Sequence, residues 1–323
     1  MSKPSFWADK KVLVTGANGF FGRNLMPLLR QTGAQIVAPS RQDCDLLEQA
    51  AVRAMFADVC PNFVIHLAAL SGGILSNKKY PADYCYQNLL MNTLVQEEAF
   101  RAGVKKYVTL IGGCSYPAKA PSPIAETELW NGYPQPESAP YSVAKKINVT
   151  LAEAYRRQHG FDAIVLVPGN VYGPWDNFDL EHSHVIPATI RKYYEAALRG
   201  DAEIVAWGSG KPVRDFIYIG DACEAVVRAA EIYSGPDIIN ISSGVPTTIA
   251  ELVNTVAELV GFRGQIRWDT TKPDGQTHKV FQVDRMKEWL GYQPPTTLRD
   301  GLQKTIAWFK ENYAKARLEV AVA

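Results

Sequence analysis

The stretch Val14-Thr15-Gly16-Ala17-Asn18-Gly19-Phe20-Phe21-Gly22 decides the fold. Residues 11–15 form a short apolar run rich in β-branched side chains, which predicts a buried strand, and residues 23–33 predict a helix that ends at a glycine. Glycines between such a strand and helix allow a tight turn and let backbone N–H groups approach a pyrophosphate at the helix N-terminus. An ordinary glycine turn is the alternative, but the flanking strand and helix favour a dinucleotide site.

The next predicted strand, 35–38, indicates which dinucleotide binds. It ends in Pro39-Ser40-Arg41. An NAD site usually carries an acidic residue here for the ribose 2′-hydroxyl, whereas a cation suits the additional 2′-phosphate of NADP. The sequence therefore predicts NADP (NADPH) as cofactor, with Arg41 as a solvated loop charge in the alternative.

A second motif, Tyr141-Ser142-Val143-Ala144-Lys145, stands 125 residues after the first glycine of the turn. Pro140 suits the first turn of a helix over 141–158, and residues four apart lie on one helix face. A nearby ammonium, with the positive nicotinamide ring, would favour the phenolate and lower the pKa of Tyr141 toward a useful range. The same spacing occurs on surface helices, but after a glycine turn it predicts proton transfer beside a nicotinamide.

Strand-like and helix-like segments alternate along the first three quarters of the chain. The predicted strands are 11–15, 35–38, 62–67, 106–111, 163–168 and 237–242, and helices are expected at 46–57, 86–102, 141–158 and 221–232. This alternation predicts an α/β protein with a doubly wound (Rossmann), mostly parallel sheet. The expected division is an NADP-binding domain of 1–169 plus 215–243 and a smaller, interleaved α/β substrate domain of 170–214 plus 244–323. Residues 117–140 contain six prolines and predict a loop over the site.

Composition limits the possible partners. The 323 residues carry a net charge of +1, which argues against nucleic acid or an anionic membrane as partner. The five cysteines are scattered without CxxC or CxxH pairs, so we expect no metal site and no disulfide framework. With free thiols, no signal peptide and no apolar run of membrane-spanning length, a cytoplasmic location is expected.

Several local strings resemble one enzyme family. They are Tyr80-Pro81-Ala82-Asp83, Cys114-Ser115-Tyr116-Pro117, Tyr141 to Lys145, Asn177-Phe178 with Ser183-His184-Val185-Ile186-Pro187, Trp207-Gly208-Ser209-Gly210, and Lys272-Pro273-Asp274-Gly275. On these strings the chain resembles the extended short-chain dehydrogenase/reductases, and among them the GDP-L-fucose synthase family. That resemblance implies C3 and C5 epimerisation of a GDP-linked 4-keto-6-deoxy sugar, followed by reduction at C4.

The resemblance also implies roles for individual residues. Tyr141 resembles the proton donor to the C4 oxygen and Lys145 its helper, while Cys114 and His184 resemble the acid/base pair of the epimerised carbons. A ketone at C4 acidifies the neighbouring C–H groups, and a thiolate and an imidazole can move such protons near neutral pH.

The implied binding residues fall into two groups. The cofactor-binding residues are Gly16, Asn18, Gly19, Phe20, Phe21, Gly22, Arg41, Asp45, Leu46, Leu67, Ala68, Ala69, Lys145 and His184. The substrate-binding residues are Asn170, Val185, Arg191, Trp207, Arg214 and Lys279. Arg191, Arg214 and Lys279 resemble the cations around the substrate pyrophosphate. A homodimer through helices 86–102 and 141–158 is also implied.

One position departs from the family pattern. The family carries a serine four residues before the Tyr-Pro of the cysteine string, where this chain has Gly112. That serine hydrogen-bonds the reacting sugar oxygen, and loss of such a donor slows a reaction by orders of magnitude. Two alternatives therefore stay open: an epimerase of a related nucleotide sugar without net reduction, and a non-catalytic NADP-binding protein.

Overall fold

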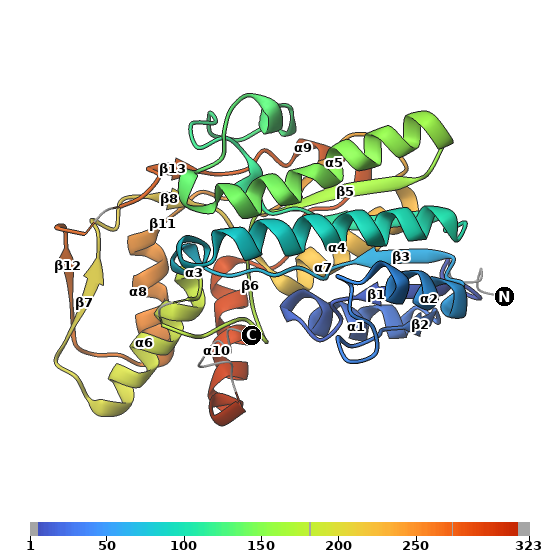
Figure 1. Ribbon diagram of the computed structural model, residues 1–323. Helices are drawn as coiled ribbons and strands as arrows, with labels where there is room; N and C mark the ends of the chain where they lie inside the picture. Colours follow the sequence, from blue (N-terminus) through green and yellow to red (C-terminus); the bar gives the residue numbers. More distant parts are fainter. Residues whose placement is uncertain (1–5, 181, 273, 316–323) are drawn as a thin grey trace.

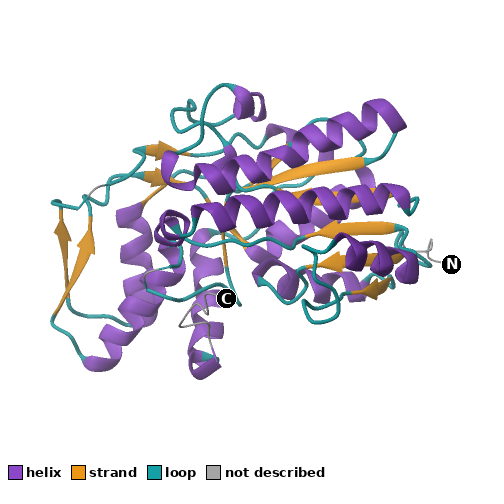
Figure 2. Ribbon diagram, in the orientation of Figure 1, coloured by secondary structure: helices purple, strands orange, loops and turns teal. Residues whose placement is uncertain are grey.

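A six-stranded parallel sheet forms the centre of the molecule in the computed structural model, which describes residues 6–180, 182–272 and 274–315 (Figures 1 and 2). The strand order is β10-β5-β4-β3-β1-β2, and every pair in this sheet is parallel. The strands are β1 (Lys11–Thr15), β2 (Gln35–Val37), β3 (Phe63–His66), β4 (Lys106–Leu110), β5 (Ala163–Pro168) and β10 (Ile239–Ile241). The predicted doubly wound α/β fold is thus confirmed.

Helices cover both faces of this sheet because its strands are apolar on both sides. One face packs against α1 (Phe20–Gln31), α7 (Ile219–Ile232) and α9 (Asp284–Leu290). The other face packs against α2 (Gln49–Val59), α4 (Pro81–Arg101) and α5 (Ala139–His159). Figure 1 shows α4 and α5 lying side by side across the second face. Helix α4 begins at Pro81, five residues earlier than predicted, because proline suits the first turn.

The second region lies beyond the carboxyl ends of the strands. Helices α6 (Val185–Arg199), α8 (Ile249–Val260) and α10 (Leu298–Glu311) enclose a separate apolar core. Three small sheets complete it: β7 (Glu203–Trp207) with β12 (Gln265–Asp269), β6 (Asn170–Tyr172) with β9 (Phe216–Tyr218), and β8 (Val213–Arg214) between β11 (Thr247–Thr248) and β13 (His278–Lys279).

Residues 280–292 cross back to the first region. Val283, Met286 and Leu290 are buried in the same core as α1 and α7. The sequence assigns these residues to the substrate domain, but their packing joins them to the nucleotide-binding sheet. The chain then returns to the second region with α10. With the predicted boundaries at 170, 215 and 244, it therefore crosses between the two regions five times.

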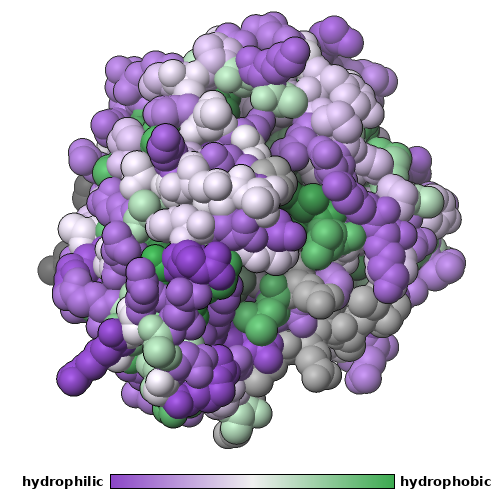
Figure 3. Space-filling model, turned by 90° about the vertical axis from the view of Figure 1, so that its left-hand side faces the viewer, coloured by the Kyte–Doolittle hydropathy of each residue, from purple (hydrophilic) through white to green (hydrophobic). Residues whose placement is uncertain are grey.

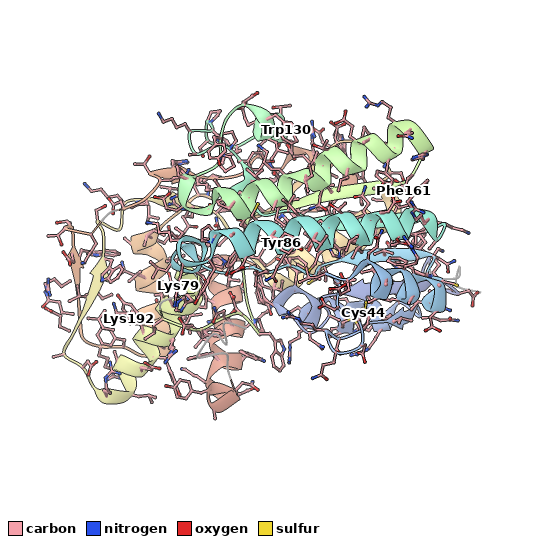
Figure 4. The ribbon with its side chains drawn as sticks, in the orientation of Figure 1. Cys44, Lys79, Tyr86, Trp130, Phe161 and Lys192 are labelled. Atoms are coloured by element: carbon pink, nitrogen blue, oxygen red, sulfur yellow. The ribbon has the colours of Figure 1, made fainter. Side chains whose placement is uncertain are left out.

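The proline-rich segment 117–140 is held in place over the first region. It contains the short 3-10 helices η2 (Glu126–Trp130) and η3 (Pro136–Ser138), in addition to irregular chain. Lys146 on α5 donates to the Leu129 carbonyl at 2.6 Å and lies 4.5 Å from the Trp130 ring centre. Figure 4 labels Trp130 on this segment. Among the described residues, no helix has the length and apolar character needed to cross a membrane.

Candidate active site

The glycine turn between β1 and α1 is too tight for side chains. Gly16 has a φ of +71°, and a Cβ atom on Gly22 would lie 2.3 Å from the Gly16 carbonyl oxygen. A Cβ atom on Gly16 would in turn lie 2.6 Å from the Ala68 nitrogen, so residues 67–69 pack directly against the turn. Helix α1 has no side-chain cap at Gly19, which suits its first N–H groups for an anionic ligand.

Arg41 stands at the predicted position beyond β2. It is exposed, while the neighbouring Ser40 donates from both its backbone and its hydroxyl to the Asp43 carboxylate at 2.8 and 2.7 Å. These bonds lower the pKa of Asp43. A pocket of about 530 Å³, lined by Val37, Cys44 and Met55 among others, runs between this loop and α2.

Tyr141, Lys145 and Cys114 come together at the carboxyl end of β4. Cys114 lies on the 3-10 helix η1 (Gly113–Ser115), and the two other residues lie on the first turns of α5. Burial lowers the pKa of Lys145 to about 8, and the charge of Cys114 opposes that shift. An ideal Cβ on Gly112 would lie 3.0 Å from the Cys114 sulfur and 3.8 Å from Cε1 of Tyr141, so position 112 borders both groups.

The pKa of Tyr141 moves in the direction opposite to the expected one. Burial raises it, and the nearby Cys114 and Tyr84 raise it further. The Tyr84 ring meets the Tyr141 ring edge-on with 6.1 Å between the centres. The expectation of a lowered pKa was wrong for the groups of the protein itself, because desolvation of the phenolate is the largest effect on this side chain. A phenol held in its protonated form is suited to donate a proton.

A buried polar network beneath these residues was not predicted from the sequence. His66, at the end of β3, bonds Thr15 Oγ1 at 2.7 Å and Asn92 Oδ1 at 3.1 Å. Asn92 also donates to the Ala144 carbonyl at 3.5 Å, next to Lys145. Burial and the charge of Lys145 lower the pKa of His66 to about 3, so this imidazole is neutral. It ties the strand before the glycine turn to the helix that carries Tyr141 and Lys145.

His184 and Lys279 approach the site from the second region. His184 precedes α6 as its N-cap residue and keeps exposed surface. Desolvation by the protein atoms around its ring, together with the positive charge of Lys279, lowers its pKa. Burial also lowers the pKa of Lys279, while the charge of Cys114 acts to raise it. Lys279 thus interacts electrostatically with both members of the predicted acid/base pair. The neighbouring His182 instead binds the Asp179 carboxylate, a contact that orders its own loop.

A pocket of about 240 Å³ lies in the second region beside this cluster. It is lined by four of the predicted substrate residues, Asn170, Val185, Trp207 and Arg214, and by Gly210, Pro212, Phe216, Ile249 and Asp274. Trp207 is 70% exposed, and the Lys272 ammonium lies 5.5 Å from the centre of its ring. Pro273, also in a family string, lies outside the described residues. Figure 3 shows this end of the molecule, where hydrophilic side chains surround a few hydrophobic ones.

Arg191, like Lys279, differs from the four predicted substrate residues that line this pocket. It lies on α6, where its guanidinium binds the Glu195 carboxylate at 2.8 Å and the Phe178 carbonyl at 3.2 Å. It does not line the 240 Å³ pocket. Its contacts in this structure brace α6 against the preceding loop.

Comparisons with known proteins agree with this arrangement. The family described as "NAD dependent epimerase/dehydratase family" matches residues 12–242. The chain belongs to this family. It is 41% identical to a probable GDP-L-fucose synthase 1 of Oryza sativa subsp. japonica, over 97% of this chain and 96% of that one. It is 36% identical to a GDP-L-fucose synthase of Escherichia coli, over 96% of this chain and 99% of that one. The resemblance identified from the sequence is confirmed.

Solved structures of similar proteins extend the comparison. A GDP-L-fucose synthetase from Naegleria fowleri bound to NADP superimposes with a TM-score of 0.87 at 28% identity, covering 96% of this chain and 97% of that one. A GDP-6-OMe-4-keto-L-xylo-heptose reductase from C. jejuni also gives a TM-score of 0.87, at 27% identity, covering 94% of this chain and 98% of that one. Solved proteins with this fold therefore include a GDP-L-fucose synthetase and a GDP-sugar reductase.

Proposed function

We propose that this chain is an NADP-dependent epimerase/reductase that converts a GDP-linked 4-keto-6-deoxy sugar by C3 and C5 epimerisation followed by reduction at C4. The observation that carries the proposal is the convergence of Tyr141, Lys145 and Cys114 with His184 and Lys279, beside a pocket lined by predicted substrate residues. The sequence identity to GDP-L-fucose synthases supports the choice of sugar nucleotide.

The cradle around the glycine turn fits a dinucleotide. A Cβ on Gly16 or Gly22 would fill the space next to the helix N-terminus, and this chain has none there. Gly16 to Gly22 would hold the pyrophosphate, Ala68 and its neighbours would border it, and Arg41 would bind the 2′-phosphate. When bound, NADPH supplies the hydride for reduction at C4. The cofactor role of Asp45, Leu46 and His184 is part of the same proposal.

Epimerisation uses Cys114 and His184. The ketone at C4 acidifies the protons at C3 and C5, so removal of one proton gives an enolate of the sugar. Cys114 lies close to the ammonium groups of Lys145 and Lys279, which stabilise negative charge in this part of the site. His184 has a lowered pKa and is neutral near pH 7, so it can accept a proton. One group removes a proton and the other returns a proton to the opposite face.

Reduction uses Tyr141 and Lys145. The alkoxide that develops at C4 needs a proton, and the protonated phenol of Tyr141 supplies it. Lys145 is almost fully buried, so its ammonium acts at short range on the phenolate that remains. The pKa of Lys145, about 8, lets it pass a proton back to Tyr141 near neutral pH.

Incubation with GDP-4-keto-6-deoxymannose and NADPH in deuterated water tests the proposal. The expected result is oxidation of NADPH together with deuterium at C3 and C5 of the product. Deuterium uptake without NADPH oxidation would instead identify an epimerase without net reduction, an alternative that Gly112 favours. Binding of both ligands without either reaction would identify a non-catalytic protein.

We further propose a homodimer formed by the outer faces of α4 and α5. Tyr86 on α4 is 65% exposed and Val143 on α5 is 42% exposed, and Figure 4 shows Tyr86 on this face of the molecule. Apolar side chains exposed on two adjacent long helices suit a four-helix contact across a two-fold axis. Light scattering should give twice the chain mass, and Tyr86→Glu should give the monomer. The free cysteines fit a cytoplasmic location.

A further inference from the structure

Two cations face each other across the small sheet of the second region. Strands β8 and β13 pair in parallel so that Arg214 lies opposite Lys279. Burial lowers the pKa of both side chains, and the charge of Arg214 lowers the pKa of Lys279 further. The two positive charges repel each other, and together they suit a dianionic ligand such as a diphosphate.

Asp215 is the buried anion next to this pair. It follows Arg214 directly, it is fully buried, and its charge raises the pKa of Lys279. One carboxylate oxygen accepts the backbone N–H groups of Gly244 and Phe281, each at 3.2 Å. The Phe281 contact lies two residues after Lys279, so Asp215 holds the chain that carries this lysine.

The backbone of Asp215 extends the same connection to the pocket. Its carbonyl oxygen accepts a hydrogen bond from the Asn170 side-chain amide at 2.8 Å. Asn170, Arg214 and Lys279 are three of the predicted substrate-binding residues, and they come from three separate segments of the chain. Asp215 is the residue at which the three segments meet.

A carboxylate in this position lowers the stability of the folded protein. Burial raises the pKa of Asp215 to about 6, although the backbone N–H groups of Gly244 and Phe281 favour its charged form. A neutral residue at this position would avoid the cost of desolvating the carboxylate. Residues that reduce stability in this way are expected where function requires them.

We propose that Asp215 is a positioning residue for binding of the substrate diphosphate, because its hydrogen bonds fix the segments that carry Arg214 and Lys279 side by side. This inference rests on the proposed function, in which these cations bind the diphosphate of the sugar nucleotide. The charged or titratable groups that act on Lys279 are Arg214 from β8, Cys114 from η1, His184 from the start of α6, and Asp215 itself. Of these, Asp215 and Cys114 favour the ammonium, and Asp215 contacts the lysine strand directly.

Binding of GDP and of inorganic pyrophosphate, measured by calorimetry with the cofactor site saturated by NADP⁺, tests the proposal. In Asp215→Asn we expect about tenfold weaker binding of both ligands at neutral pH. The loss relative to wild type should grow as pH rises above neutrality, because without the Asp215 carboxylate the Lys279 side chain loses its proton at a lower pH. Adding Lys279→Arg to Asp215→Asn should remove this growth with pH, since arginine stays charged. Glu126→Gln, which neutralises another buried carboxylate away from the pocket, is the matched control and should bind both ligands as wild type does.

Two outcomes would overturn the inference. Tighter binding in Asp215→Asn would mean that the carboxylate only repels the diphosphate. A loss that is equal at every pH and is not relieved by Lys279→Arg would mean a structural role alone. If Asp215→Asn does not fold, the single variant Lys279→Arg serves as the test. It should still bind GDP and pyrophosphate at high pH, where the wild-type protein no longer binds them. Binding of pyrophosphate but not GDP by wild type would contradict the proposed substrate class and leave the Asp215 result to be judged on pyrophosphate.

Discussion

Replacing Gly112 by serine should accelerate the reductive half of the reaction. Gly112 has φ −89° and ψ 152°, an extended conformation that any residue adopts, so serine causes no backbone strain there. Its Cβ would lie 3.0 Å from the Cys114 sulfur, which can turn away because it is a rotatable side chain, and 3.8 Å from the Tyr141 ring. The new hydroxyl would therefore stand beside the reacting oxygen that Tyr141 protonates.

The size of the effect follows from the value of a hydrogen bond in the transition state. A fully preorganised donor contributes about 10²–10³ in kcat. A serine that the surrounding residues do not orient should contribute less, and we expect about a tenfold gain, or about 1.4 kcal/mol. The gain should fall on kcat rather than KM, because the bond strengthens as charge develops on the oxygen.

The assay is NADPH oxidation with GDP-4-keto-6-deoxymannose under single-turnover conditions. Gly112→Ala is the matched control, since it adds the same Cβ without the hydroxyl and should leave the reduction rate at or below that of wild type. Gly113→Ser should not accelerate reduction, because its Cβ would lie 2.4 Å from the Phe281 ring. If Gly112→Ser is no faster than Gly112→Ala, the missing hydroxyl does not limit reduction.

Four further predictions concern other parts of the molecule. Cys114→Ser should suppress deuterium exchange next to the ketone, and His184→Ala should leave an incompletely epimerised product. Tyr141→Phe should abolish reduction while exchange persists. Exchange at the wild-type rate in both Cys114→Ser and His184→Ala would contradict the assigned acid/base pair. Arg41→Ala should raise the KM for NADPH about tenfold to a hundredfold and leave that for NADH unchanged, as initial rates would show. Gly22→Ala should abolish NADPH binding in a fluorescence titration, because its Cβ would lie 2.3 Å from a backbone oxygen. Gly33→Ala has no atom within 4 Å of the new Cβ, so it should bind NADPH normally although its φ of +85° costs some stability. The pKa of Asp215 is raised from 3.8 to about 6, so the wild-type protein loses stability as pH rises through this window. Measured by denaturant unfolding, the free energy of unfolding of Asp215→Asn should gain about 3 kcal/mol relative to wild type between about pH 4 and pH 7.

The sheet could be predicted from the sequence because its signals are local. Each strand of the main sheet is a short apolar run, and the turn at Gly16 to Gly22 has a steric requirement that only glycine meets. Tyr141 and Lys145 could be paired because a helix places residues four apart on one face. These features depend on residues that are neighbours in sequence.

Features that depend on contacts between distant segments could not be predicted. In the sequence, nothing distinguishes Asp215 from any other charged residue next to a strand. Its role depends on the pairing of β13 with β8, which brings Lys279 beside it. His66 looks like the end of a buried strand until Asn92 and Thr15 close around it. The raised pKa of Tyr141 also needs the fold, since burial and Tyr84 cause it and neither is visible in a five-residue motif.

The return of residues 280–292 to the first region has a consequence for how the protein can be taken apart. Phe281 packs against Gly113, directly before Cys114, and against Gly169 at the end of β5, while Val283 and Met286 enter the core beneath α1 and α7. A division that assigns residues 280–292 to the substrate region would remove this support from the segment that carries Cys114. Chimaeras that exchange substrate regions between relatives should therefore keep residues 280–292 with the nucleotide-binding half. Chimaeras joined at residue 244 alone should bind sugar nucleotide poorly and should fold less cooperatively than either parent.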